Sequence, residues 1–244
     1  MTLREYLVAS REPRYSIAMA VPLLILYEGL AAVMTRSSYE GVRNGADVLL
    51  KTIFVTLGGP AGVGIFGLLL AGFGAWLIVS DIRRRGRLIT KVFPLMLVES
   101  LIYAALLGSI VNALTSLLLN PTLATYQGGV VQIGLGTQLV VSLGAGLYEE
   151  LLFRVLLVTG ITAACTRLGL RRTPAVAVAV LGSALIFSGF HYVGPLGDPL
   201  TLPSFTFRAV AGLLLSGLYV ARGFGITAWA HALYDVALSI LIAA

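Results

Sequence analysis

Residues 92–119 read VFPLMLVESLIYAALLGSIVNALTSLLL, with Glu99 as the one acid or base among them. A transmembrane helix needs about 20 consecutive, mostly apolar residues, and this stretch exceeds that length. Asn120 and Pro121 follow it, and this pair breaks a helix. The stretch therefore predicts a membrane-spanning helix and decides the class of the protein.

The composition of the whole chain agrees with a membrane protein. Of its 244 residues, 58% are hydrophobic and 11% are charged, and the mean hydropathy is +0.94. Soluble domains are about 45–50% apolar and about 25% charged, so the numbers exclude a water-soluble domain and a disordered chain. The one cysteine, Cys165, excludes a disulfide-stapled secreted module.

Further apolar stretches lie on both sides of 92–119. They predict an all-α, polytopic membrane bundle of about seven transmembrane helices. The predicted spans are 17–34, 61–80, 92–119, 130–165, 174–192, 204–220 and 226–243. We expect 48–57 to be a short helix at the membrane interface. An eighth span would require 41–57 to cross, which Asp47 and Lys51 oppose.

The net charge of +6 is not spread evenly along the chain. Most bases gather at alternate ends of the predicted spans: Arg4, Arg11, Arg14, Arg83, Arg84, Arg85, Arg87, Lys91, Arg167, Arg171, Arg172 and Arg222. The other ends hold Arg36, Arg43 and Lys51. This asymmetry predicts a multi-pass protein of the cell membrane with a cytosolic N-terminus. No aromatic residues interleave with the basic run, so the lipid bilayer is the expected partner and nucleic acid is not.

Ionisable side chains inside the later spans are the strongest functional signal. Each costs about 2.5–3.5 kcal/mol at mid-bilayer on insertion scales, so each requires a reason. Both histidines of the protein are among them. The ionisable residues of the later spans are Glu149, Glu150, Arg154, His191, Arg208, His231 and Asp235.

The first acidic motif is Glu149-Glu150-Leu-Leu-Phe-Arg154. On a helix Glu150 and Arg154 share a face and can pair. Glu149 is rotated about 100° away and has no local partner, so it can accept a proton from water. The alternative, in which both acids bind Arg154 and hold the bundle together, stays open.

Two further motifs align Phe187 with His191 and His231 with Asp235 at helical spacing. Three chemistries fit these groups. An acid assisted by a histidine can activate water while the other histidine stabilises an oxyanion. Both histidines and a carboxylate can bind zinc. A proton or ion path needs no bond cleavage. Ser188 lacks a nucleophile-elbow sequence and is a weaker candidate.

In this order, on three predicted spans, the motifs Glu149-Glu150-x-x-x-Arg154, Phe187-x-x-x-His191 and His231-x-x-x-Asp235 resemble a known family. This is the CPBP (CAAX protease and bacteriocin-processing, or Abi) family of intramembrane glutamic endopeptidases. The chain is similar to its type II CAAX prenyl endopeptidases. The resemblance covers roughly residues 135–243.

The resemblance implies an all-helical membrane endopeptidase that cleaves a membrane-anchored peptide or protein. Glu149 matches the general base, and His191 helps to activate the water. Glu150 and Arg154 orient the site, and His231 with Asp235 stabilises the oxyanion. The last position is often Asn in the family. A carboxyl group donates to an oxyanion only when protonated. The alternative, in which Asp235 fixes a histidine tautomer, stays open.

The remaining expectations concern substrate, cofactor and organisation. Phe187 and Arg208 are candidates for substrate contact, and Arg208 can also pair with an acid. No cofactor is expected. The alternatives are a zinc-dependent protease of the same fold and a non-catalytic member with an immunity or regulatory role. We divide the chain into a cytosolic segment (1–16), accessory transmembrane helices (17–134) and a catalytic core (135–243).

Two structural expectations accompany this division. Glu28 and Glu99 are expected to hydrogen-bond across the bundle more readily than to line a water-filled cavity. Gly144 and Gly146 are expected to permit close helix packing, and Gly189 to admit a helix or a peptide.

The histidine positions conflict with straight, perpendicular helices. Counted from the cytosolic ends, His191 lies about 27 Å deep and His231 about 9 Å deep. Either 171–177 follows the cytosolic surface, or the loop at 194–199 folds back into the bundle.

Overall fold

The computed structural model describes residues 1–37, 43–119, 134–194 and 197–243, and these ranges contain helices and no strand. The all-α prediction is confirmed. The α-helices are α1 (Leu3–Ala9), α2 (Pro13–Ser37), α3 (Gly45–Gly58), α4 (Gly62–Arg85), α5 (Val92–Leu118), α6 (Leu135–Gly144), α7 (Thr159–Arg167), α8 (Arg172–Phe190), α9 (Leu202–Arg222) and α10 (Phe224–Ala243). A 3₁₀ turn, η1 (Gly59–Ala61), joins α3 to α4. Two π-helical segments, η2 (Ala145–Glu149) and η3 (Leu151–Val158), lie between α6 and α7.

Six stretches of the described chain are long and apolar enough to cross a membrane. They correspond to α2, α3 with α4, α5, α8, α9 and α10. The predicted span 130–165 is not one of them, because it is divided into shorter helical segments and carries three charged residues. Of this span, 130–133 lies outside the described residues.

The predicted helix at 48–57 is α3, which extends from Gly45 to Gly58. It folds back onto α4 through a tight turn. Gly59 has φ +61°, which favours glycine. A Cβ on Gly62 would lie 2.2 Å from the carbonyl oxygen of Phe54, so only glycine fits there. The α3–α4 pair is therefore set by its glycines.

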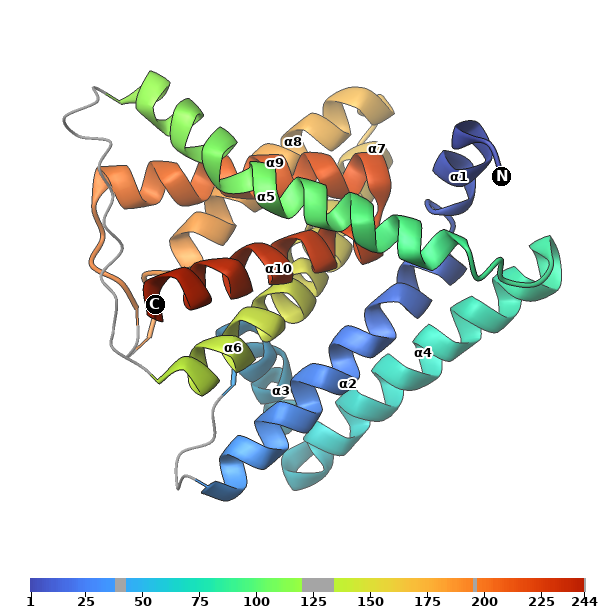
Figure 1. Ribbon diagram of the computed structural model, residues 1–244, viewed down its shortest axis with the longest axis horizontal. Helices are drawn as coiled ribbons and strands as arrows, with labels where there is room; N and C mark the ends of the chain where they lie inside the picture. The colour runs from blue at the N-terminus through green and yellow to red at the C-terminus, as the bar shows by residue number, and fades with distance from the viewer. Residues whose placement is uncertain (38–42, 120–133, 195–196, 244) are drawn as a thin grey trace.

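The centre of the bundle is α10, which packs against α2, α5, α6, α9 and η2. In Figure 1 it lies between α5 and α9 above and α6 and α2 below, and α4 runs beside α2. The helices cross at wide angles, unlike a set of parallel spans.

The first membrane helix begins earlier than the predicted residue 17. The helix α2 begins at Pro13. Proline suits the first turn of a helix, because a backbone N–H at that position would have no intrahelical acceptor, and proline has no N–H to leave unpaired. Arg14 is then buried, and it pairs with Glu12 at 2.6 Å and faces Asp81 at 3.7 Å. The helix thus includes part of the segment expected to be cytosolic.

The isolated acids of the first and third spans have protein partners, as expected. Glu28 pairs with Arg43 at 3.0 Å and with Lys51 at 3.1 Å. Glu99 pairs with Arg222 at 2.6 Å and accepts a hydrogen bond from the hydroxyl of Tyr6 in α1. Burial and the adjacent carboxylate raise the pKa of the Tyr6 phenol above its ordinary value. The phenol is therefore a stable donor.

Candidate active site

The two motif acids lie where the helix changes its winding. Glu149 ends η2, and Glu150 joins η2 to η3, which contains Arg154. π-helical turns are rare and occur frequently at functional sites. Here they lie in the segment that faces α10, from which His231 and Asp235 project.

Two glycines before the acids let other segments approach, as predicted. A Cβ on Gly146 would lie 2.4 Å from the carbonyl oxygen of Ala228 and 2.6 Å from the nitrogen of Ala232, both in α10. A Cβ on Gly144 would lie 2.6 Å from Asn44 Cβ and from a ring carbon of Tyr27. The absence of a side chain at these positions therefore brings α10 and the start of α3 to the acids.

Glu150 is fully buried between two partners. Its Oε1 lies 2.9 Å from Arg154 Nη1 and 2.7 Å from His231 Nδ1. The predicted pairing of Glu150 with Arg154 is confirmed. Removing one partner from a buried ion pair leaves an uncompensated charge. The Glu150–Arg154 pair is therefore needed for the stability of the fold as well as for the candidate site.

Glu149 is also buried, with 7% of its surface exposed, but its contacts differ. Its Oε1 accepts a hydrogen bond of 2.8 Å from the Asn44 side-chain amide. Its Oε2 has no hydrogen-bond partner in the described part of the chain. It interacts electrostatically with His191 and His231. Among the described residues, Arg154 forms its ion pair with Glu150, at 2.9 Å. Glu149 interacts with Arg154 electrostatically, but no ion pair joins these two described side chains, so the two acids are not equivalent partners of the arginine.

His191 caps the C-terminal end of α8. Its Nδ1 lies 2.8 Å from the backbone carbonyl oxygen of Phe187. A carbonyl oxygen only accepts hydrogen bonds, so Nδ1 carries the proton. The neutral ring then presents Nε2 as a proton acceptor. This tautomer suits a group that assists Glu149.

His231 lies between two carboxyl groups. Its Nδ1 faces Glu150, and its Nε2 lies 3.4 Å from Asp235 Oδ2. The ring can donate to both only as an imidazolium, because neutral imidazole has a single N–H. The position of Asp235 fits the expectation that it orients a histidine.

The two histidines meet at Phe187 despite their unequal depths. The Phe187 ring centroid is 4.8 Å from that of His191 and 6.2 Å from that of His231. The depth count fails because the helices are not all perpendicular to one plane (Figure 1). Residues 195–196 of the 194–199 loop lie outside the described residues, but Asp198 lies next to the site, since its amide donates to the His191 carbonyl oxygen at 3.0 Å. Residues 172–177 are the first turns of α8.

A family match covers all of these motifs. Residues 131–237 match the family model described as Rce1-like, type II CAAX prenyl endopeptidase Rce1-like. This segment is therefore similar to the Rce1-like family. No curated protein and no solved structure matches the chain. The match confirms the resemblance to CAAX proteases and supports, in general terms, a CAAX-type intramembrane protease in a multi-pass membrane protein.

Within the Rce1-like segment, the two candidate substrate contacts have internal partners. Phe187 is 3% exposed, and the Arg154 guanidinium lies 4.5 Å above its ring. Arg208 pairs with Asp198 and lies over the Tyr192 ring. Phe187 therefore packs against the buried arginine and against both histidines. Substrate contact by Phe187 and Arg208 stays a prediction.

The last turn of α8 has open space at Gly189. Apart from its own helix, no described atom lies within 4 Å of a Cβ built there. The expectation that a helix approaches Gly189 is therefore wrong among the described residues. The alternative, an approaching peptide, stays a prediction.

No group of three His, Cys, Asp or Glu side chains in the described ranges is arranged to hold a metal ion. Both ring nitrogens of His231 face carboxylate oxygens instead. Metal analysis of the purified protein, with activity measured before and after chelation, tests the zinc alternative.

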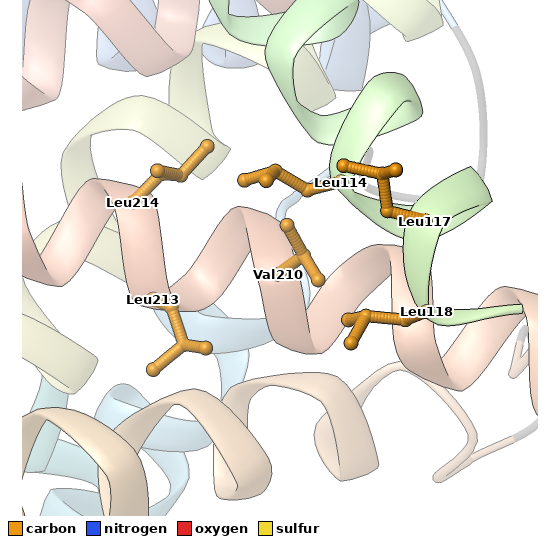
Figure 2. Close-up of a pocket in the computed structure, with 6 residues that line it drawn as sticks. All are labelled: Leu114, Leu117, Leu118, Val210, Leu213 and Leu214. Carbon is orange, nitrogen blue, oxygen red and sulfur yellow. The ribbon is translucent and has the colours of Figure 1, made fainter.

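An apolar pocket of about 440 Å³ lies between α5 and α9, away from the acids. Figure 2 shows the side chains that line it: Leu114, Leu117, Leu118, Val210, Leu213 and Leu214. It has no acid, base or hydroxyl with which to activate water. The candidate site for hydrolysis is therefore the buried cluster around Glu149.

Sequence reasoning missed Asn44 as a member of this cluster. An asparagine before a helical stretch is a recognisable N-cap signal, but nothing in the sequence indicates which distant side chain its amide contacts. The glycine at position 144 offers the one indirect clue, because it leaves room beside the acids.

Proposed function

We propose that this protein is an intramembrane endopeptidase in which Glu149 activates the water that cleaves a membrane-associated or lipidated substrate. One observation carries the proposal. Glu149 is a buried carboxylate with one oxygen held by Asn44, and its other oxygen has no hydrogen bond from the described residues. Such a group can bind a water and take its proton.

The reaction follows from these positions. Glu149 Oε2 accepts a proton from water as the water oxygen bonds to the peptide carbonyl carbon. His191, with Nε2 as an acceptor, orients the same water. The resulting oxyanion shares the Nε2–H of His231 with Asp235, because the Nδ1–H of the same ring is donated to Glu150. When the C–N bond breaks, the proton held by Glu149 passes to the leaving amine, and the carboxylate is restored.

Glu150 and Arg154 act on the position of His231. Glu150 Oε1 accepts from His231 Nδ1 and is held by Arg154. The ring is thereby fixed with Nε2 directed toward Asp235. We assign Glu150, Arg154 and Asp235 to this positioning task, and Phe187 and Arg208 to substrate contact, while Glu149, His191 and His231 contact the reacting atoms.

The location is part of the proposal. The concentration of bases at alternate span ends supports a protein of the cell membrane with a cytosolic N-terminus. The family supports substrates embedded in or anchored to the membrane. We assign the catalytic core to residues 135–243 and accessory helices to 17–134.

The test uses purified protein in lipid vesicles. The probes are two internally quenched peptides, one with a farnesylated cysteine three residues before its C-terminus and one without the lipid. We expect cleavage of the lipidated probe, and loss of cleavage in Glu149→Gln and in His191→Ala. Cleavage that survives Glu149→Gln contradicts the mechanism. Activity lost on chelation and restored by zinc favours the zinc alternative. A folded wild-type protein that cleaves neither probe favours the non-catalytic alternative.

A further inference from the structure

We infer that Asn44 is a positioning residue for Glu149, contributed by a segment outside the Rce1-like residues 131–237. The inference rests on the proposed function, since it concerns how the general base is held. Asn44 precedes α3 and is separated from Glu149 by 105 positions in the sequence. The helices before the family segment therefore complete the site.

The orientation of the Asn44 amide is fixed by two different partners. Its Oδ1 accepts a hydrogen bond of 2.8 Å from the Ala46 backbone N–H, which is the N-cap bond of α3. The side-chain nitrogen must then be the atom directed at Glu149 Oε1, 2.8 Å away. A flipped amide would place two acceptors against each other at one contact and two donors at the other. Asn44 is 3% exposed, so water does not compete for these bonds.

The backbone of Asn44 is held as firmly as its side chain. Its N–H donates to the Tyr27 hydroxyl at 3.1 Å. That hydroxyl donates to Asp47 Oδ2 at 2.8 Å. The chain from α2 to α3 therefore has a continuous hydrogen-bond path that ends at Glu149.

An ion cluster anchors this path. Asp47 is fully buried and lies 2.9 Å from Arg43 Nη1 and 2.7 Å from Lys51 Nζ. Glu28 in α2 pairs with the same two bases. We call these four residues the α3 cluster. Tyr148, next to Glu149, donates to Glu28 at 2.8 Å, so the cluster contacts the catalytic segment at a second point.

The consequence for catalysis is geometric. The Asn44 donor fixes Oε1 and with it the plane of the carboxylate, which leaves Oε2 for the water. Without the donor, the carboxylate can rotate within its buried space toward the cations of the site. The general base would then be present but misdirected, and small errors in orientation lower rates strongly.

Two substitutions separate this role from helix capping. Asn44→Ser keeps a good N-cap, but its hydroxyl is too short to cap Ala46 and reach Glu149. Asn44→Ala removes both contacts. We expect both to lower kcat by about 10- to 100-fold, the range for a hydrogen bond to a charged group, with KM for the lipidated probe unchanged. Only Asn44→Ala should also lower the melting temperature.

The matched control is Thr2→Ala. Thr2 caps α1 by accepting from the Glu5 amide, and it contacts no member of the site. We expect its kcat to equal that of the wild type. If Asn44→Ser does not fold, Asn44→Thr, which also caps a helix but has no amide donor to reach Glu149, takes its place with the same expected loss.

The outcomes distinguish this inference from the proposed function. If a folded Asn44→Ser or Asn44→Thr protein keeps kcat within about twofold while Glu149→Gln is inactive, Asn44 only caps α3 and the inference is wrong. If KM rises and kcat does not change, Asn44 affects substrate binding and the inference is also wrong. If Glu149→Gln itself remains active, the proposed function fails first.

Discussion

Two charged clusters lie side by side in this protein, one partly exposed and one buried, and they use their charges differently. In the α3 cluster, Glu28 and Asp47 each pair with both Arg43 and Lys51, at 2.7–3.1 Å. Each acid there faces two bases. In the neighbouring site, Glu149 is held by an uncharged amide through one oxygen and has no such partner at the other. Acids that each pair with two bases stabilise the structure around the site, whereas an acid that one uncharged amide holds through a single oxygen can react at the other.

The largest effect expected from this contrast follows removal of the Glu149 carboxylate. Glu149→Gln removes the proton acceptor and keeps the shape of the side chain. We expect kcat to fall by about 10²- to 10⁴-fold, the contribution typical of a general base, with little change in melting temperature. Steady-state cleavage of the lipidated peptide and thermal unfolding in vesicles measure the two quantities.

The matched variant is Glu28→Gln in the α3 cluster. It removes one acid from a group that also contains Asp47 and that touches the catalytic segment only through Tyr148 and Asn44, so we expect a lower melting temperature and a much smaller loss of kcat than in Glu149→Gln. Equal losses of kcat in the two variants would show that the contrast between the clusters is wrong.

Glu150 combines the properties of both clusters and should show the next largest effect. Glu150→Ala leaves Arg154 fully buried without its carboxylate and releases His231. Breaking a buried ion pair costs about 3–5 kcal/mol, so we expect a large loss of unfolding free energy together with lost activity. Denaturant unfolding measures it. A Glu150→Ala protein as stable as the wild type would show that the pair is not structural.

Particular residues show how far the sequence could predict this site. The pairing of Glu150 with Arg154 follows from helical spacing, and the close approach at Gly144 and Gly146 follows from the missing side chains. The meeting of His191 and His231 does not follow, because crossing angles depend on packing that no single span encodes. Asn44 was missed for a related reason: its amide contacts an acid 105 positions away, which no local pattern records.

A smaller effect is expected from substituting the glycines at which helices pack. Gly146 and Gly189 can be compared because one is closely packed and the other has open space around it. Gly146→Ala places a methyl group against the α10 backbone, which cannot move aside as a flexible side chain can. Overpacking of this kind costs about 1–3 kcal/mol, and it should also lower kcat by shifting His231. Gly189→Ala has open space among the described residues and should leave the melting temperature unchanged. A destabilised Gly189→Ala with an unaffected Gly146→Ala would reverse the assignment of close packing.

The smallest effect is expected at Asp235, where this chain differs from the residue often found in the CPBP family. Asp235 Oδ2 lies 3.4 Å from His231 Nε2, and its side chain is 28% exposed. Partly exposed ion pairs contribute about 0–1 kcal/mol. Asn offers an oxygen to the same N–H and adds a donor for the oxyanion, so Asp235→Asn should keep kcat within about fivefold of the wild type. Asp235→Ala, which offers neither atom, should lose more, as measured by initial rates on the same peptide. If Asp235→Asn and Asp235→Ala lose activity equally, the negative charge of Asp235 is what orients His231. Asp235 would then act as an ion-pair partner, like the acids of the α3 cluster, and not as an acid with an oxygen available for chemistry, like Glu149.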